Sequence, residues 1–167
     1  GIARAVGEAS QRFIEDRLRI LRVFRFTSRI GGKIDIQTAN AIRKDNRLRG
    51  IDEKSNVSQE RIWDEMKKAA KQAKNYSEYL EFFNEFDMWD QVFPGAKINT
   101  KIEKTDSFIS YIANLFKFDN ISDLEKRMVL EYKIEYDTAS KVVFLINLLK
   151  LTPELAFDLY KQKVKCH

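Results

Sequence analysis

Asp16 and Arg19 are the residues whose types and spacing point most directly to molecular recognition. The apolar periodicity around them predicts a helix over residues 15–30, and side chains three apart on a helix emerge next to each other. A carboxylate beside a guanidinium presents an acceptor and a planar fork of donors. That edge complements an exocyclic amine next to a ring-nitrogen acceptor, which both adenine and cytosine carry. Guanine and uracil place a carbonyl where the amine would be, and two facing acceptors repel each other.

The same two residues also fit a local ion pair near a helix N-terminus, where Asp is favoured. Exposed pairs of this kind contribute about 0.3–0.5 kcal/mol to stability. The residue types alone therefore leave two interpretations open, a base-recognising edge and an ordinary surface ion pair.

Basic residues concentrate in the first third of the chain. Residues 1–50 hold 12 Lys and Arg against 5 Asp and Glu, whereas the remaining 117 residues hold 18 against 20. Ten of the first 12 are Arg, which forms forked hydrogen bonds with phosphates and base edges. On the predicted helix, four of them lie within about 120° of each other, opposite the apolar side: Arg19, Arg22, Arg25 and Arg29. A solvated basic face is the alternative explanation.

Catalytic patterns are missing from the sequence. There is no Asp-x-Asp pair for a two-metal site, no Gly-rich phosphate loop and no Gly-x-Ser-x-Gly. One His and one Cys, His167 and Cys166, leave no catalytic triad and no His- or Cys-based metal site. The longest mostly apolar stretch, residues 142–149, is too short to cross a membrane. We therefore expect no catalytic residue, no metal ligand and no membrane segment in this chain.

Helix caps and periodicity predict an all-α fold of about eight helices. After the helix over residues 15–30, which should end at Gly31-Gly32, we expect helices at 36–47, from 58, from 77, at 107–116, from 122, at 137–151 and from 153. The aromatic residues Trp63, Phe83 and Trp89 should lie in the core rather than stack on bases. We find no convincing strand.

Three motifs, in order, give the chain a family resemblance. The run Glu15-Asp16-x-x-Arg19-x-x-Arg22-x-x-Arg25-Phe26, followed by Ile34-Asp35-x-x-Thr38-x-x-Ala41-Ile42, resembles the neck of class II CCA-adding enzymes. These are tRNA nucleotidyltransferases closely related to bacterial poly(A) polymerases. The stretch Ser58-Gln59-Glu60-Arg61-Ile62-x-x-Glu65-Met66 is similar to a further motif of the family. The resemblance covers about residues 1–72.

The resemblance implies a role for each matching residue. Asp16 and Arg19 would form a protein template that pairs with ATP or CTP, and Glu15 would orient Arg19. Arg22 and Arg25 would complete the nucleotide pocket. Phosphates of tRNA would be contacted by a second, basic set: Arg29, Lys67, Lys71 and Lys74. Arg61, with Glu60, is expected to hold the neck together rather than to touch substrate.

The resemblance also implies a division of the chain. Residues 1–14 would lead out of a catalytic head, 15–75 would form the neck, 76–117 the body and 118–167 a tRNA-binding tail. The family's head, which binds Mg²⁺ through an Asp-x-Asp motif, has no counterpart here, so we expect the chain to bind nucleotide and tRNA without catalysing transfer. A cytoplasmic location is expected, with an organellar version possible. Arg17 is a departure, since the family often has Pro there.

Two alternative functions stay open. The neck motif does not separate CCA addition from poly(A) synthesis or from the addition of CC or A alone. A free-standing helical RNA-binding module without catalysis is the other alternative.

Overall fold

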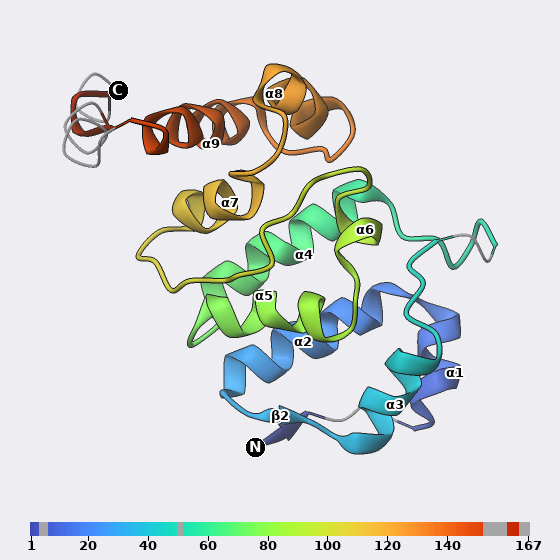
Figure 1. Ribbon diagram of the computed structural model, residues 1–167. Coiled ribbons are helices and arrows are strands. Elements are labelled where there is room, and N and C mark those ends of the chain that lie inside the picture. The colour runs from blue at the N-terminus through green and yellow to red at the C-terminus, as the bar shows by residue number, and fades with distance from the viewer. Residues whose placement is uncertain (4–6, 50–51, 152–159, 164–167) are drawn as a thin grey trace. The chain divides into compact units, whose positions relative to one another are not determined.

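The computed structural model describes residues 1–3, 7–49, 52–151 and 160–163 (Figure 1). The chain divides into two compact units, with the boundary in the sequence after Gly95. The first unit contains β1 (Ile2–Ala3), α1 (Ala9–Glu15), α2 (Leu18–Ile30), β2 (Lys33–Ile34), α3 (Ile36–Lys44), α4 (Gln59–Gln72), α5 (Tyr76–Glu85) and α6 (Trp89–Val92). The second contains α7 (Phe108–Phe116), α8 (Ile121–Leu130) and α9 (Tyr136–Leu149). The predicted helical fold is confirmed, and the expected helix from residue 153 lies outside the described residues.

The core of the first unit forms around α2. One side of this helix is fully buried and packs against α4 and α5. Phe24 lies at the centre, with its ring 5.2–5.4 Å from those of Phe82, Phe83 and Phe86. Such aromatic clusters bury large apolar areas, and their offset and edge contacts add to that stabilisation. Trp63, Phe83 and Trp89 are buried, as the sequence predicts.

Most helices begin where their caps predict. Asp35 accepts a hydrogen bond from the Thr38 N–H, and Ser58 and Ser107 accept bonds from the third residue beyond each of them. The fourth and sixth predicted helices begin one or two residues early. Asn75 and Asn120, rather than Ser77 and Ser122, provide their caps. Asn is as strong a cap as Ser, so the sequence offered two equivalent starts.

The single helix expected over residues 15–30 is wrong. It is two helices, α1 and α2, with a break at Asp16, whose backbone is extended (φ −153°, ψ 109°). The Asp16 carboxylate accepts a hydrogen bond from the Leu18 N–H at 3.1 Å. A short acidic side chain can satisfy backbone donors in this way, and it thereby competes with the helical pattern. The break places Asp16 at the junction of two helices.

The C-terminal end of α2 leads into β2, one of two short strands in the first unit. The predicted stop is confirmed at Gly31, which adopts a left-handed conformation (φ 66°) suited to glycine. Beyond it, β2 pairs in parallel with β1, with Ile2 opposite Lys33. This pair was not predicted, because two-residue strands leave no periodicity to detect.

The second unit is built from α7, α8 and α9, with α9 packed against both of the others. Arg127 ties the start of α8 to its end: it pairs with Asp119 at 2.7 Å and donates to the Tyr132 hydroxyl at 3.3 Å. The Asp119 side chain is 4% exposed, so this ion pair is largely removed from solvent. It fixes the loop that precedes α8.

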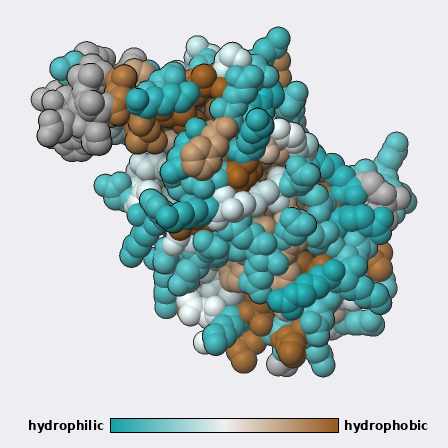
Figure 2. Space-filling view, viewed as in Figure 1, coloured by the Kyte–Doolittle hydropathy of each residue, from teal (hydrophilic) through white to brown (hydrophobic). Residues whose placement is uncertain are grey.

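The surface is mainly hydrophilic on the face seen in Figure 2, with hydrophobic surface along α9. Leu149 is 55% exposed there. None of the helices in the described part of the chain is both long enough and apolar enough for a transmembrane span.

Candidate functional site

Asp16 is held by a residue of another helix. Both of its carboxylate oxygens face the guanidinium of Arg61, in the first turn of α4, at 3.4 Å (Oδ1 to Nη1) and 3.1 Å (Oδ2 to Nη2). Burial of Asp16 raises its pKa, but hydrogen bonds from Arg61 and the Leu18 N–H and the charge of Arg22 outweigh burial and lower the pKa overall. Asp16 is therefore ionised at neutral pH and can only accept hydrogen bonds.

Arg19 contacts Glu15 rather than Asp16. Its Nη1 atom donates to the Glu15 carboxylate at 2.6 Å and to the Arg12 carbonyl at 3.0 Å. Arg12 in turn donates to Glu15 at 3.0 Å. The Arg19 hydrogen bond is the main reason that the pKa of Glu15 is lowered. The expected contact between Glu15 and Arg19 is thus present, whereas the expected pairing of Asp16 with Arg19 side by side on one helix is not.

Donor groups of Arg19 remain available. Both contacts of this side chain use Nη1, and within the described part of the chain Nε and Nη2 have no hydrogen-bond partner. The Arg19 side chain is 28% exposed. An incoming group can therefore reach the free side of the fork while Glu15 holds the other side.

Arg25 lies deeper and has a different partner. Its Nε donates to Glu65 and its Nη1 donates to Gln72 at 2.9 Å, both on α4. The Arg25 and Glu65 side chains are 11% and 2% exposed, so this is a buried ion pair between two helices. Arg22 is half-buried between these contacts and makes no hydrogen bond or ion pair to a described residue. The family resemblance assigns both Arg22 and Arg25 to a nucleotide pocket. In the structure Arg25 is paired with Glu65, whereas Arg22 has no such partner among the described residues.

The four expected RNA contacts lie near the C-terminal ends of α2 and α4. Lys74 donates to the Ile30 carbonyl at 3.3 Å, where a cation stabilises the last turn of α2. Arg29 is exposed and stacks over Phe26 at 5.4 Å. Lys71 is exposed and Lys67 half-buried. Cations are therefore gathered at one end of the helix pair.

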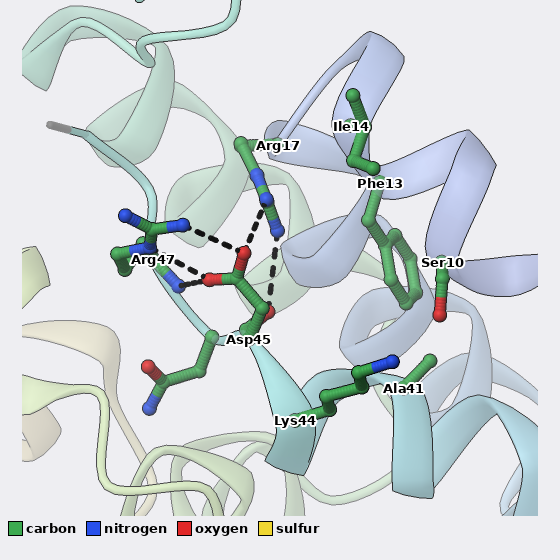
Figure 3. Close-up of a pocket in the computed structure, with 9 residues that line it drawn as sticks. Ser10, Phe13, Ile14, Arg17, Ala41, Lys44, Asp45 and Arg47 are labelled. Atoms are coloured by element: carbon green, nitrogen blue, oxygen red, sulfur yellow. Dashed lines mark hydrogen bonds and ion pairs between the residues drawn. The ribbon is translucent and has the colours of Figure 1, made fainter. Parts of the chain in front are cut away.

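A cavity of about 460 Å³ lies in the first unit, between α1 and α3 (Figure 3). Arg17 forms one wall, 2% exposed, and donates to the carboxylate and the carbonyl of Asp45 at 2.7 and 3.2 Å. Arg47 contacts the same carboxylate, and these bonds lower the pKa of Asp45. None of the expected site residues lines this cavity.

Sequence reasoning gave Arg17 and Arg61 no place in the site. Arg17 was noted only as a departure from Pro, and its pairing with Asp45 spans 28 positions, which no local pattern reveals. Arg61 was expected to hold the neck together, and the structure shows it joining α4 to the α1–α2 junction.

A metal site is not built from the described residues, among which no three His, Cys, Asp or Glu side chains gather to hold an ion. The carboxylates near the junction, Glu15 and Asp16, are occupied by guanidinium groups. The described residues therefore do not fit a Mg²⁺ site. Cys166 and His167 lie outside the described residues.

Comparison with known proteins points to one family. The human mitochondrial CCA tRNA nucleotidyltransferase 1 is 31% identical over 140 residues, which is 75% of this chain and 30% of the human protein. The CCA-adding enzyme of Streptococcus uberis is 31% identical over 136 residues, 81% of this chain and 32% of that enzyme. The chain is a relative of the CCA-adding enzymes. No protein-family model matches it.

Shorter stretches match other CCA-adding enzymes more closely. That of Ligilactobacillus salivarius is 48% identical over 48 residues, 29% of this chain and 12% of the enzyme. Across the relatives named here, the chain spans between 12% and 32% of their length. The similarity supports the predicted resemblance to CCA-adding enzymes, and it concerns only part of each of them.

Proposed function

We propose that this chain supplies base selection and tRNA binding to a nucleotidyltransferase that adds CCA to the 3′ end of tRNA. The observation that carries the proposal is the α1–α2 junction. There an ionised acceptor, Asp16, lies between the two helices, and a guanidinium with unused donors, Arg19, lies in the first turn of α2; each is held by a charged partner. The relationship to CCA-adding enzymes supports the same function.

Selection follows from the protonation state of Asp16. The ionised carboxylate accepts a hydrogen bond from the exocyclic amine of adenine or cytosine, and Arg19 donates to the neighbouring ring nitrogen. GTP or UTP would instead turn a carbonyl toward Asp16, which leaves two acceptors facing each other and both unsatisfied. Glu15 keeps Arg19 oriented, and Arg22 completes the pocket. Arg25 supports it by joining α2 to α4.

Further parts of the proposal concern the rest of the protein. Residues 1–14 would connect to a catalytic head that holds Mg²⁺, residues 15–75 would be the neck, 76–117 the body and 118–167 the tail. The basic group near the ends of α2 and α4 would contact tRNA phosphates: Arg29, Lys67, Lys71 and Lys74. A cytoplasmic or organellar location belongs to the same proposal, since the human relative is named mitochondrial.

The test measures nucleotide choice in the protein that contains this chain. We expect Asp16→Ala and Arg19→Ala to reduce the preference for ATP and CTP over GTP and UTP by about tenfold or more, because each removes a hydrogen bond to a charged group. Affinity for tRNA should stay nearly unchanged. Arg43→Gln is the matched control, since it removes an exposed ion pair with Glu85 elsewhere in the unit.

The choice of RNA separates CCA addition from its alternatives. Substrates are tRNA ending before CCA, tRNA ending after CC, and an unrelated RNA. The proposal expects CCA and A, respectively, on the two tRNAs and no extension of the unrelated RNA. Extension of any RNA with A alone would indicate a poly(A) polymerase, and binding without extension would indicate an RNA-binding module.

Asp16→Ala and Arg19→Ala variants that still prefer ATP and CTP over GTP and UTP as strongly as the wild type would contradict the template role.

A further inference from the structure

The cavity between α1 and α3 combines apolar and charged side chains. Its volume of about 460 Å³ is typical of small-molecule sites, which are mainly apolar and carry a few polar groups that orient the ligand. We use the term apolar wall for Phe13, Ile14 and Ala41. Ile14 is 51% exposed, so this wall presents apolar surface to water. None of the residues proposed to select the base or to contact tRNA lines the cavity, so the proposed function leaves it unexplained.

Asp45 is the one acidic side chain among the described residues that line the cavity, and its carboxylate is fully occupied. Its Oδ1 atom receives the backbone N–H and Nε of Arg47, at 3.2 and 2.9 Å. Its Oδ2 atom receives Nη2 of Arg17 and Nη2 of Arg47, at 2.7 and 3.0 Å, and Figure 3 shows both guanidinium groups turned toward it. A carboxylate offers about four lone-pair sites. A ligand that needs an acceptor therefore finds none on Asp45.

The groups of the lining that remain available are donors. Lys44 Nζ and the Ser10 hydroxyl make no hydrogen bond or ion pair to a described residue. Arg47 uses only Nε and Nη2 of its side chain, which leaves Nη1. Arg17 Nε is buried and has no acceptor among the described residues, so Asp45 compensates this guanidinium only in part. The described lining therefore attracts anions and offers them several hydrogen bonds.

The net charge of the lining indicates how highly charged the ligand is. Arg17, Lys44 and Arg47 contribute three positive charges and Asp45 one negative charge, which leaves +2. Hydrogen bonds from Arg47 and the charge of Arg17 keep the pKa of Asp45 below its ordinary value, so the carboxylate is ionised at neutral pH. Lys44 and Arg47 are exposed, whereas Arg17 and Phe13 are buried. The two accessible cations thus lie at the mouth of the cavity.

We propose that this cavity binds a small phosphate monoester, with its phosphate group on Lys44 and Arg47 and its organic part on the apolar wall. A phosphate monoester carries a charge of about −1.5 to −2 at pH 7 and three strong acceptor oxygens, which matches a lining of net charge +2 whose free groups are donors. Both guanidinium and ammonium groups bind phosphate in proteins. The apolar wall requires an organic part, because a free phosphate ion would leave that wall in contact with water.

Phenyl phosphate is a suitable probe, because it carries a phosphate and an apolar ring but no base to pair with Asp16 and Arg19. It is titrated into the 167-residue chain at constant ionic strength, and ¹H–¹⁵N NMR follows the backbone amides. We expect saturable shifts of the amides of Ser10, Lys44 and Arg47. Inorganic phosphate should bind about tenfold more weakly, because it buries no apolar surface. Benzoate should also bind more weakly, because it carries only one negative charge.

Three variants locate the binding site. Lys44→Gln should weaken the binding of phenyl phosphate about tenfold, because it removes a hydrogen bond between charged groups. Ala41→Leu should also weaken it, because the larger side chain fills part of the cavity while the charge stays the same. Arg43→Gln is the matched control: it removes a positive charge from the neighbouring position of α3, which does not line the cavity, and should leave the affinity within about twofold of the wild type.

Four outcomes would overturn the proposal. The first is an absence of saturable shifts, and the second is the same shifts with sodium chloride in place of phenyl phosphate. The third is equal weakening by Lys44→Gln and Arg43→Gln, which would indicate general attraction to a basic surface. The fourth is an affinity for inorganic phosphate as high as that for phenyl phosphate, which would show that the apolar wall takes no part. The nucleotide preference of Asp16→Ala and Arg19→Ala is measured separately, so either proposal can fail without the other.

Discussion

At the scale of single residues, Asp16 has a different partner from the one its spacing predicts. The three-residue separation from Arg19 suggests contact within one helix, yet the carboxylate interrupts that helix and meets Arg61, 45 positions away. Arg19 turns instead to Glu15. The sequence thus predicted candidate residues, whereas their pairing depended on which helices pack together.

The Asp16–Arg61 pair should make stability depend on pH. Because the folded pKa of Asp16 is below its ordinary value of 3.8, the ionised group stabilises the fold above that pH, and this contribution is lost as the pH falls through the folded pKa. We expect Asp16→Asn, which keeps an acceptor for Leu18, to lower the free energy of unfolding by about 0.5–1 kcal/mol at pH 7. Urea unfolding between about pH 5 and pH 2 should show the difference shrinking towards zero. A difference that does not change with pH would contradict this assignment.

At the scale of elements, α2 and α4 run side by side in the same direction. Contacts join them at the start (Asp16 to Arg61), in the middle (Arg25 to Glu65) and at the end (Ile30 to Lys74). The arginines of α2 that the helical wheel places on the polar side are therefore not a uniformly solvated face. The periodicity of α2 predicts which side is apolar, but it contains no information about a neighbouring helix that covers part of the polar side.

The buried Arg25–Glu65 pair gives a prediction at this scale. Arg25→Met should lower the free energy of unfolding by about 3 kcal/mol, because it leaves Glu65 buried without a partner. Adding Glu65→Leu should restore most of the loss, since no isolated charge then remains. As a control, Arg43→Met removes an exposed pair and should lower it by less than about 1 kcal/mol. Urea denaturation measures all three, and equal losses for Arg25→Met and Arg43→Met would refute the buried-pair interpretation.

At the scale of the whole molecule, the chain forms two units whose boundary follows Pro94-Gly95. Residues 96–106, which begin the second unit, contain no helix or strand. In this segment Lys97 and Lys101 have backbone N–H groups bonded to Asp119 and Asn99. For Lys104, which is exposed, no such bond is present among the described residues.

Limited proteolysis tests this organisation. We expect trypsin to cut first after Lys104, because cleavage requires a backbone that can open locally without breaking a packed helix. Mass spectrometry of early time points should then show two fragments that resist further digestion. First cuts within α2 or α4 would instead show that the first unit opens more readily than the segment that follows it.

The sequence by itself determined the helical class, most helix starts, the apolar side of α2 and the family resemblance, because these follow from local caps, periodicity and motif spacing. It also singled out Asp16 and Arg19 as candidates, through the motif spacing that carries the family resemblance. Only the tertiary structure decided that Asp16 breaks a helix, that Arg61 holds it, and that Arg25 is buried against Glu65. The last two depend on segments 45 and 40 positions apart meeting at one place, and for Arg25 and Glu65 the pairing matters because packing has largely removed both charges from water.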